Sequence, residues 1–205
     1  MKTGPRYKIA KRLGASVFEK AQTQKFALSA DRSAKNKRGG RRGRQSEYGK
    51  QMLEKQKVRI TYGLPEKQFR NYINRALVAH TGVTTSPSEQ LHEQLEMRLD
   101  NVVWRMGLAS TRRGARQMAA HGHLTVNGRK TRIPSYALSV GDRVGVREGS
   151  KEHGLLAGFA ERERSLPSWL SFDVRAMEGT IVARPTTASA DPAGDLGAVL
   201  SFYTR

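Results

Sequence analysis

The sequence predicts an α+β protein with a helical N-terminal region, a unit of two packed helices on a small, mostly antiparallel sheet, and a basic extended N-terminal arm. Three observations support this prediction. Apolar residues recur at helical spacing between residues 48 and 106. Short segments from 124 to 147 alternate between apolar and polar residues, with turn signals between them. Residues 34 to 44 are mostly lysine, arginine and glycine, and offer almost nothing apolar to a core.

The N-terminal arm divides into two parts. Residues 1 to 30 hold scattered apolar residues, four of which would line one side of a short helix: Ile9, Leu13, Val17 and Phe18. Lys11, Arg12 and Lys20 would be exposed around it. Residues 34 to 44 read AKNKRGGRRGR, in which six of eleven residues are basic. Such a segment is disordered alone and folds against phosphate; a solvated linker is the alternative interpretation.

Two helices are predicted after the arm. The first runs from Tyr48 to Tyr62 and ends at Gly63, and Pro65 suits the first position of the second helix. The second helix carries an apolar stripe made of Phe69, Tyr72, Ile73, Ala76 and Leu77. We expect these aromatic side chains to lie in a core. Stacking of exposed rings on nucleic-acid bases is the alternative.

A third predicted helix is long. Residues 86 to 89, Ser-Pro-Ser-Glu, form a capping box with proline at the first helical position. The helix would run to Gly107, which can supply a left-handed turn. Arg98 and Arg105 flank its apolar stripe, whereas Trp104 lies opposite and would pack against a neighbouring segment or stack on a base. The stripe consists of Leu91, Leu95, Leu99, Val102, Val103 and Met106.

The next helix is predicted to carry a phosphate site. Ser110 or Thr111 can cap it, and Arg112 lies in its first turn. The apolar residues Ala115 and Met118 would point to one side of this helix. The basic residues Arg113 and Arg116 would point to the opposite side. Unpaired backbone N–H groups, the positive end of the helix dipole and an arginine cluster therefore coincide, a combination that suits a phosphate.

Short strands are predicted to follow. Leu124 and Val126 alternate with polar residues and lead into Asn127-Gly128, a strong hairpin signal. The next basic residues are Arg129, Lys130 and Arg132. Residues 140 to 142 predict another turn, and residues 143 to 147 alternate again, so that the valines would face the helices and the arginines would face outward.

The character of the chain changes after Arg147. Residues 155 to 160 predict a short helix, and residues 169 to 172 and 180 to 182 predict strands. Residues 186 to 194 form a turn-rich linker. Residues 198 to 203 are apolar, and because their exposure would be costly we expect them to dock on an earlier element.

No catalytic chemistry is indicated. Carboxylates are sparse, no nucleophile stands at a recognisable spacing from a base, and no glycine-rich phosphate loop occurs. His121 and His123 suggest a metal pair, but no further ligand stands nearby and Gly122 favours a turn, so contact with phosphate is the preferred interpretation. We expect no enzyme activity, no metal or other cofactor, and no small-molecule substrate.

The charge is large and unevenly distributed. The net charge is +19, of which residues 1 to 60 carry +14, residues 61 to 149 carry +6, and residues 150 to 205 carry −1. A polyanion would relieve the resulting repulsion, which favours nucleic acid. An anionic membrane is the alternative, but the basic arm lacks an amphipathic face and the sequence has no apolar run of spanning length or apolar signal core. The absence of cysteine excludes disulfides and cysteine zinc sites.

Several long motifs resemble one known family. RLDNVVWRMG at 98–107, ARQ at 115–117, VNG at 126–128 and SY at 135–136 resemble the RNA-binding domain named after small ribosomal subunit protein four. Motifs outside that domain resemble bacterial-type members of the family itself: EKQKVR at 54–59, YG at 62–63, QFRNY at 68–72 and the terminal FYTR. The resemblance is close from about residue 45 to residue 205 and loose before that.

The resemblance implies a domain arrangement and a function. The arm would span 1–45, and a helical domain at 46–90 would be completed by about 185–205, with the RNA-binding domain inserted at 91–184 around a core at 98–147. It implies a structural protein of the small ribosomal subunit that binds the five-helix junction in the 5′ domain of 16S ribosomal RNA early in assembly. Contact with small-subunit protein five would support translational accuracy beside the channel through which mRNA enters, with mRNA as a further contact.

The resemblance also has departures and alternatives. Many members bind zinc through four N-terminal cysteines, which are missing here, so the N-terminal region must fold without metal or on its partner. A bacterial cytoplasm is expected, with a plastid as the alternative. A free-standing RNA-binding stress or regulatory factor is the competing function, and a DNA- or membrane-binding basic protein is a more distant one.

The predicted RNA-contacting side chains form two sets. The N-terminal set is Arg38, Arg41, Arg42, Arg44, Lys55, Lys57 and Arg59. The central set is Arg98, Arg105, Arg112, Arg113, Arg116, His121, Arg129 and Lys130.

Overall fold

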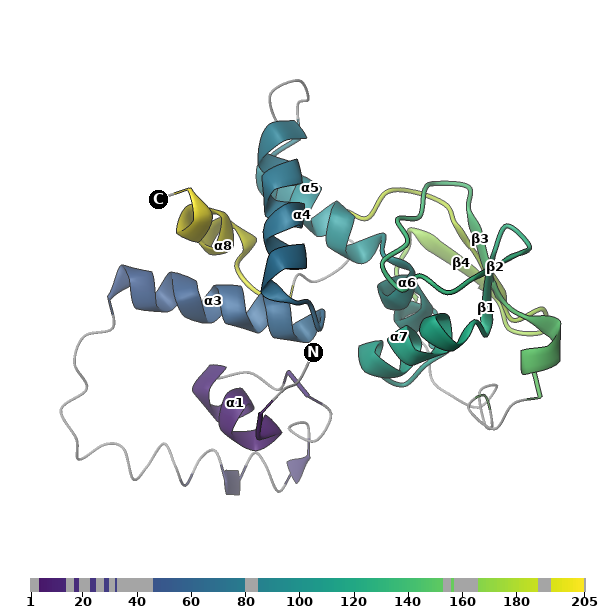
Figure 1. Ribbon diagram of the computed structural model, residues 1–205, viewed down its shortest axis with the longest axis horizontal. Coiled ribbons are helices and arrows are strands. Elements are labelled where there is room, and N and C mark those ends of the chain that lie inside the picture. Colours follow the sequence, from purple (N-terminus) through teal and green to yellow (C-terminus); the bar gives the residue numbers. More distant parts are fainter. Residues whose placement is uncertain are drawn as a thin grey trace. The chain divides into compact units, whose positions relative to one another are not determined.

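Figure 1 shows the computed structural model of the protein, whose chain divides into two compact units. Unit 1 comprises Met1–Leu77 and Pro192–Arg205, and unit 2 comprises Val78–Asp191. The structure describes residues 4–13, 17–18, 23–24, 28–29, 32, 46–79, 85–152, 156, 166–187 and 193–204. Of the described helices, none is long and apolar enough to cross a membrane.

Unit 1 is helical. Its helices are α1 (Arg6–Leu13), α3 (Glu47–Thr61), α4 (Glu66–Ala79) and α8 (Leu196–Tyr203). The Ser46 hydroxyl accepts the Gly49 N–H at the start of α3, and Gly63, with φ +63°, lies in the turn that leads to α4. The two helices predicted after the arm are therefore confirmed. The predicted N-terminal helix is shorter than expected because α1 ends at Leu13, before Val17 and Phe18, and Lys20 lies outside the described residues.

The apolar end of the chain docks within unit 1, as predicted. Helix α8 packs against α3, with Val199 and Leu200 buried. The Asp195 carboxylate caps α8 by accepting the Ala198 N–H at 2.9 Å. The Asp195 N–H in turn donates to Oε2 of Glu54 on α3 at 3.0 Å. A polar contact thus fixes the start of the helix whose apolar face is buried.

Unit 2 begins with three short helices, and one sequence prediction about them is wrong. The predicted long helix is divided into α5 (Pro87–Glu96) and α6 (Leu99–Arg105), because Arg98 is extended with φ −76° and ψ 139°. The strand-like residue Arg98 pairs with Ala137, and the Leu99 N–H donates to the Tyr136 carbonyl. Tertiary hydrogen bonds to the 134–138 segment therefore replace helical ones at this point. The capping box that begins α5 is present.

The helix that is predicted to carry a phosphate site is present in unit 2 as α7 (Arg112–His121). It is capped by Thr111, whose hydroxyl accepts the Gly114 N–H at 2.8 Å. Gly107, with φ +74°, lies in the turn after α6. Helices α6 and α7 pack together against one face of the sheet (Figure 1). Ala115 and Met118 are buried, as their spacing indicated.

The sheet of unit 2 is five-stranded and antiparallel throughout, in the order β2-β1-β3-β5-β4. Asn127 and Gly128 have φ of +50° and +77°, which is the two-residue hairpin turn that their sequence predicts. The predicted strands after Arg147 are confirmed with small shifts in their bounds. Of the predicted helix at 155–160, only Leu156 lies among the described residues, and it is buried. The strands are β1 (Leu124–Val126), β2 (Arg129–Thr131), β3 (Arg143–Val146), β4 (Leu170–Asp173) and β5 (Glu178–Ile181).

The core of unit 2 lies between the helices and the inner face of the sheet. Leu124, Val144 and Val146 point inward from β1 and β3 and join the buried faces of α6 and α7. Arg143 and Arg147 are exposed, so the predicted alternation of valines and arginines is confirmed. The 3-10 helix η4 (Glu148–Ser150) follows β3. The fold therefore leaves the outer face of the sheet for basic side chains.

Candidate nucleic-acid interface

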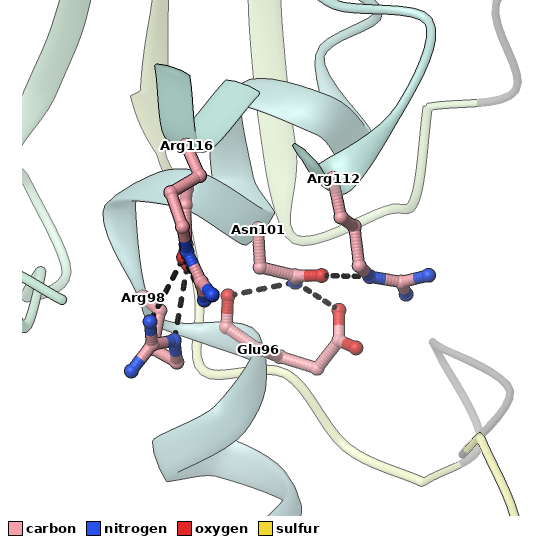
Figure 2. Close-up of polar contacts among 6 residues, drawn as sticks. Glu96, Arg98, Asn101, Arg112 and Arg116 are labelled. Carbon is pink, nitrogen blue, oxygen red and sulfur yellow. Dashed lines mark hydrogen bonds and ion pairs between the residues drawn. The ribbon is translucent and has the colours of Figure 1, made fainter. Parts of the chain in front are cut away.

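The division between α5 and α6 creates a buried ion group. Arg98 donates from Nε and Nη2 to the two carboxylate oxygens of Asp100, at 3.0 and 2.8 Å. Arg116 on α7 reaches Oδ2 of the same carboxylate from Nε and Nη2, at 2.9 and 2.6 Å. Figure 2 shows both guanidinium groups converging from different segments. Arg98, one of the predicted RNA-contacting side chains, is only 2% exposed and is held in the interior by Asp100.

A second carboxylate organises the neighbouring side chains. Glu96, which is fully buried, accepts from Nε and Nη2 of Arg105 at 2.9 and 3.0 Å. It also accepts from the Asn101 amide at 2.9 Å, and the amide oxygen of Asn101 accepts from Nε of Arg112 at 2.7 Å (Figure 2). Residues 96 and 101 therefore join the end of α5, helix α6 and the first turn of α7. The side chain of Arg105, like that of Arg98, is paired with a buried carboxylate and does not extend into solvent.

The indole ring of Trp104 contacts two of these arginines, Arg105 and Arg112. The guanidinium carbon of Arg112 lies 3.7 Å from the centre of the indole ring, and that of Arg105 lies 4.9 Å away. The ring is half-buried and also packs on the core of unit 2. Of the two interpretations of the sequence, the structure supports packing against a neighbouring segment. The ring restricts Arg112 without neutralising it.

This arginine network carries an excess of positive charge. We define it as Arg98, Arg105, Arg112 and Arg116 around Glu96, Asp100 and Asn101, and its four guanidinium groups outnumber its carboxylates by two. Arg113 is exposed beside it on the first turn of α7. The positive end of the α7 dipole lies at the same turn. The network thus presents ordered guanidinium groups to an anion, and phosphate accepts the same paired donation as carboxylate.

A second group of basic side chains lies where α7 ends and the hairpin begins. Gly122 has φ +75°, and a methyl group on its Cα would lie 2.6 Å from Cε of Lys130 and 3.2 Å from Nε of Arg132. The charges of Arg132 and Arg147 lower the pKa of Lys130 below its ordinary value. Lys130 was in the predicted set, whereas Arg132 and Arg147 were not. The outward alternation of 143–147 was the signal that indicated Arg147.

The two histidines at this end of α7 lie side by side. The ring centres of His121 and His123 are 6.1 Å apart, with 29° between the ring planes. Nδ1 of His123 is 3.1 Å from the hydroxyl of Ser150. Across the described part of the chain, no group of three His, Cys, Asp or Glu side chains could hold a metal ion. His121 and Arg129 are exposed.

The described members of the predicted N-terminal set form ion pairs within unit 1. Lys55 is buried and donates to Oε1 of Glu66 at 2.9 Å, and Arg59 lies 3.3 Å from the other oxygen of Glu66. Lys57 forms an ion pair with Glu54. Lys55 and Arg59 therefore hold α3 to α4, whereas the pair of Lys57 and Glu54 lies within α3. The other predicted members of this set, Arg38, Arg41, Arg42 and Arg44, lie outside the described residues.

The carboxylate of Glu66 also binds the end of the chain. The Tyr203 hydroxyl donates to Oε1 at 2.5 Å. Burial opposes ionisation of Glu66, but the hydrogen bonds from Tyr203 and Lys55 and the charges of Lys55 and Arg59 outweigh it, so that the pKa of Glu66 lies below its ordinary value. Burial and then the bond to Glu66 raise the pKa of Tyr203. The ring centre of Phe202 on α8 lies 4.5 Å from Nζ of Lys55.

Comparison with known proteins gives concordant results. The S4 domain model matches residues 97–144, and the model of the ribosomal protein S4/S9 N-terminal domain matches residues 1–93. Small ribosomal subunit protein uS4 of Latilactobacillus sakei is 39% identical over 99% of this chain and 98% of its own. The uS4 proteins of Acidithiobacillus ferrooxidans and Chromobacterium violaceum are 41% and 43% identical, with 98% or more of each chain covered.

Proposed function

The chain belongs to the uS4 family of small ribosomal subunit proteins, and from this premise we propose that it is a structural constituent of the small subunit that binds 16S ribosomal RNA. The arginine network of unit 2 is the observation that supports this proposal. It offers ordered, positively charged forks on a rigid support of two helices and a sheet. The relatives are bacterial, which favours a place in the ribosome of a bacterial cytoplasm.

The proposed contact is with the phosphates of folded RNA. A guanidinium group donates two parallel hydrogen bonds to phosphate, and it remains charged at every physiological pH. Arg112 and Arg113, in the first turn of α7, would be the primary contacts, since Arg112 is stacked on Trp104 and Arg113 is exposed. Arg98 and Arg105 would act by positioning their neighbours, because buried carboxylates hold them. Binding by preformed groups loses less entropy than binding by free side chains.

The basic arm would supply a second mode of binding. Residues 34 to 44 carry six positive charges and almost no apolar surface, so they would order against RNA rather than against the protein. Arg38, Arg41, Arg42 and Arg44 would provide counterion release and a strong salt dependence. Shape selectivity would come from unit 2, and a large part of the non-specific affinity would come from the arm.

Further roles follow from the proposed family function. The chain would bind the 5′ domain of 16S RNA early and help to nucleate assembly of the small-subunit body. With small-subunit protein five it would support translational accuracy near the channel through which mRNA enters. Family-model matches over residues 1–93 and 97–144 favour this ribosomal role over that of a free-standing RNA-binding factor.

The first experiment is a comparison of two RNAs across a salt titration. The affinity of the full chain is measured for the 5′ domain of 16S RNA and for an unrelated RNA of equal length. We expect a preference for the 5′ domain that persists at moderate salt, because shape recognition adds to charge. Equal affinities that collapse together with salt would contradict the proposal.

A second experiment tests the role in assembly. Small subunits are reconstituted from 16S RNA and purified proteins with this chain supplied first, supplied last or omitted. We expect stable association with naked 16S RNA, and slow or incomplete assembly when the chain is omitted. If it joined only after other proteins were bound, the nucleating role would be rejected while subunit membership would stand.

A further inference from the structure

The basic residues at the end of α7 are crowded, and no acidic partner for them occurs among the described residues. Lys130, Arg132 and Arg147 take part in none of the ion pairs among the described residues. In the arginine network, by contrast, Glu96 and Asp100 lie between the guanidinium groups. Three like charges held together without a carboxylate destabilise one another, and an anion would reverse that effect.

The fold places these three residues on one face. Lys130 lies opposite Thr125, and Thr125 opposite Gly145, in the register of β2, β1 and β3. Leu124 and Val146, which flank this row, point to the core, so the row itself belongs to the outer face of the sheet. Arg132 and Arg147 lie two residues beyond Lys130 and Gly145 on the same face. The arginine network, in contrast, is built on the helices that cover the inner face.

Arg147 is held in position from two sides. Its N–H donates to the His123 carbonyl at 2.8 Å, and its Nε lies 3.4 Å from the hydroxyl of Ser150. Ser150 is 1% exposed and also contacts the imidazole of His123. A side chain anchored in this way gives up little freedom when it binds a ligand.

Three elements near the cluster are α7, η4 and β5, and the last two carry carboxylates. Gly122, which caps the C-terminal end of α7, lies against the side chains of Lys130 and Arg132. Glu148 of η4 is the acidic residue nearest in sequence to Arg147, and it forms an ion pair with Lys151. On the outer face, Glu178 of β5 lies opposite Gly145 of β3, two residues before Arg147, and is separated from Lys130 by β1 and β3. Among the described residues, neither carboxylate forms an ion pair with the cluster.

We propose that Lys130, Arg132 and Arg147 form a phosphate-binding site on the outer face of the sheet, which holds RNA backbone separately from the arginine network. The identity of that RNA as ribosomal rests on the proposed function. The ligand is a phosphodiester group, because phosphate oxygens suit several converging cations and carry no base sequence. Unit 2 would then contact RNA on two faces, and His121 would stand at the rim of the second.

The test uses the full chain and neutral substitutions of matched charge. The first variant combines Lys130→Gln with Arg132→Gln, and the second is Arg147→Gln alone. The control combines Arg175→Gln with Arg184→Gln, which removes two exposed positive charges from other parts of unit 2. Affinity for the 5′ domain of 16S RNA and for the unrelated RNA is measured across salt concentrations.

We expect the plot of log affinity against log salt to become less steep by about two for the first variant and about one for the second. The control should retain the wild-type slope. Unchanged slopes in both variants, or an equal loss in the control, would overturn the proposal.

Thermal melting without RNA separates binding from folding. Because the three cations repel one another, the first variant should melt at or above the temperature of the wild type. A lower melting temperature would assign these residues to the fold and would overturn the site. If wild type fails to prefer the 5′ domain but the slopes still fall, the ribosomal function is wrong and the site stands. If the preference is present and the slopes are unchanged, the site is wrong and the function stands.

Discussion

Arg116 on α7 donates two hydrogen bonds, at 2.9 and 2.6 Å, to one carboxylate oxygen of Asp100 at the start of α6. This ion pair links α6 and α7 across sixteen residues of sequence. Arg98, the residue before α6, donates to the same carboxylate. The carboxylate is 4% exposed. A single buried acid therefore fixes the relative positions of two helices and the direction in which their arginines point.

Substitution of that acid should unfold unit 2 more readily. In Asp100→Asn, the guanidinium of Arg98 remains buried without a negative partner, so we expect the free energy of unfolding to fall by about 3 kcal/mol. Urea unfolding followed by circular dichroism measures this change. The control is Glu148→Gln, which removes a carboxylate that is 87% exposed and should change stability by less than about 0.5 kcal/mol. Equal effects of the two substitutions would show that the Asp100 group does not hold the unit together.

Arg113 and Arg116 should separate RNA binding from folding. Arg113→Glu changes an exposed side chain, so the fold should be retained while the affinity for 5′-domain RNA and its salt dependence both decline. Arg116→Glu places a second carboxylate beside Asp100 and should lower the free energy of unfolding by about 2 kcal/mol. Salt-dependent binding and urea unfolding are measured for both, with Arg175→Glu as the charge control. Identical profiles for the two variants would contradict their different placement.

Trp104 should affect binding through the arginines stacked on it. Trp104→Leu removes the ring beneath Arg112, and the expected loss of about 1 kcal/mol in ordering corresponds to roughly a fivefold lower affinity for RNA. Trp104→Phe keeps an aromatic face and should lose about half as much free energy. Affinities are compared at one salt concentration, and melting temperatures are recorded alongside. If leucine and phenylalanine gave the same affinity, the ring would be acting only as core packing.

Acid should weaken unit 1 through Glu66. The pKa of this carboxyl is lowered in the folded state, so the stability it contributes is fully present above its unfolded pKa of 4.5 and is lost as the pH falls through the lower folded value. Urea unfolding of the wild type and of Glu66→Gln is compared at pH 7 and below pH 4. The difference between the two proteins should shrink in acid. A difference that stayed constant would rule out ionised Glu66 as the stabilising species.

The end of the chain should be held by its last aromatic residues. Tyr203→Phe removes the hydroxyl that donates to Glu66 but retains the edge-on packing of the ring against Phe69. We expect unit 1 to lose about 1 kcal/mol, since a hydrogen bond to a charged group is strong but this one is half-exposed. Limited proteolysis at the C-terminus measures the release of α8. Unaltered proteolysis would show that packing alone holds the helix.

Much of the fold could be predicted from local pattern. The capping box at Ser86, the cap at Thr111 and the Asn127-Gly128 turn act over a few residues, and each appears in the structure as expected. Alternation in residues 143 to 147 also placed the valines and arginines of β3 correctly. These signals succeed because hydrogen bonds to near neighbours and one-sided burial are properties of the local sequence.

The long helix through Arg98 failed as a prediction for the opposite reason. Its apolar stripe continues without interruption at helical spacing, and no proline or glycine marks the break. What ends α5 is the pairing of residues 97 to 100 with the segment at 134 to 138, which is more than thirty residues away in sequence. The spacing of apolar residues within a helix carries no information about a distant segment that takes over its backbone hydrogen bonds.

The sequence by itself determined the class of this protein, its concentration of positive charge, the helices and hairpins of each unit, and a polyanion as the preferred partner. Only the tertiary structure decided which cations are available to that partner. Arg98 and Lys55 look like Arg113 and Lys130 in the sequence, yet the first two are buried against Asp100 and Glu66. The reason is physical: a charge is free or paired according to which carboxylate lies within about 4 Å of it, and packing between segments far apart in the chain sets that distance.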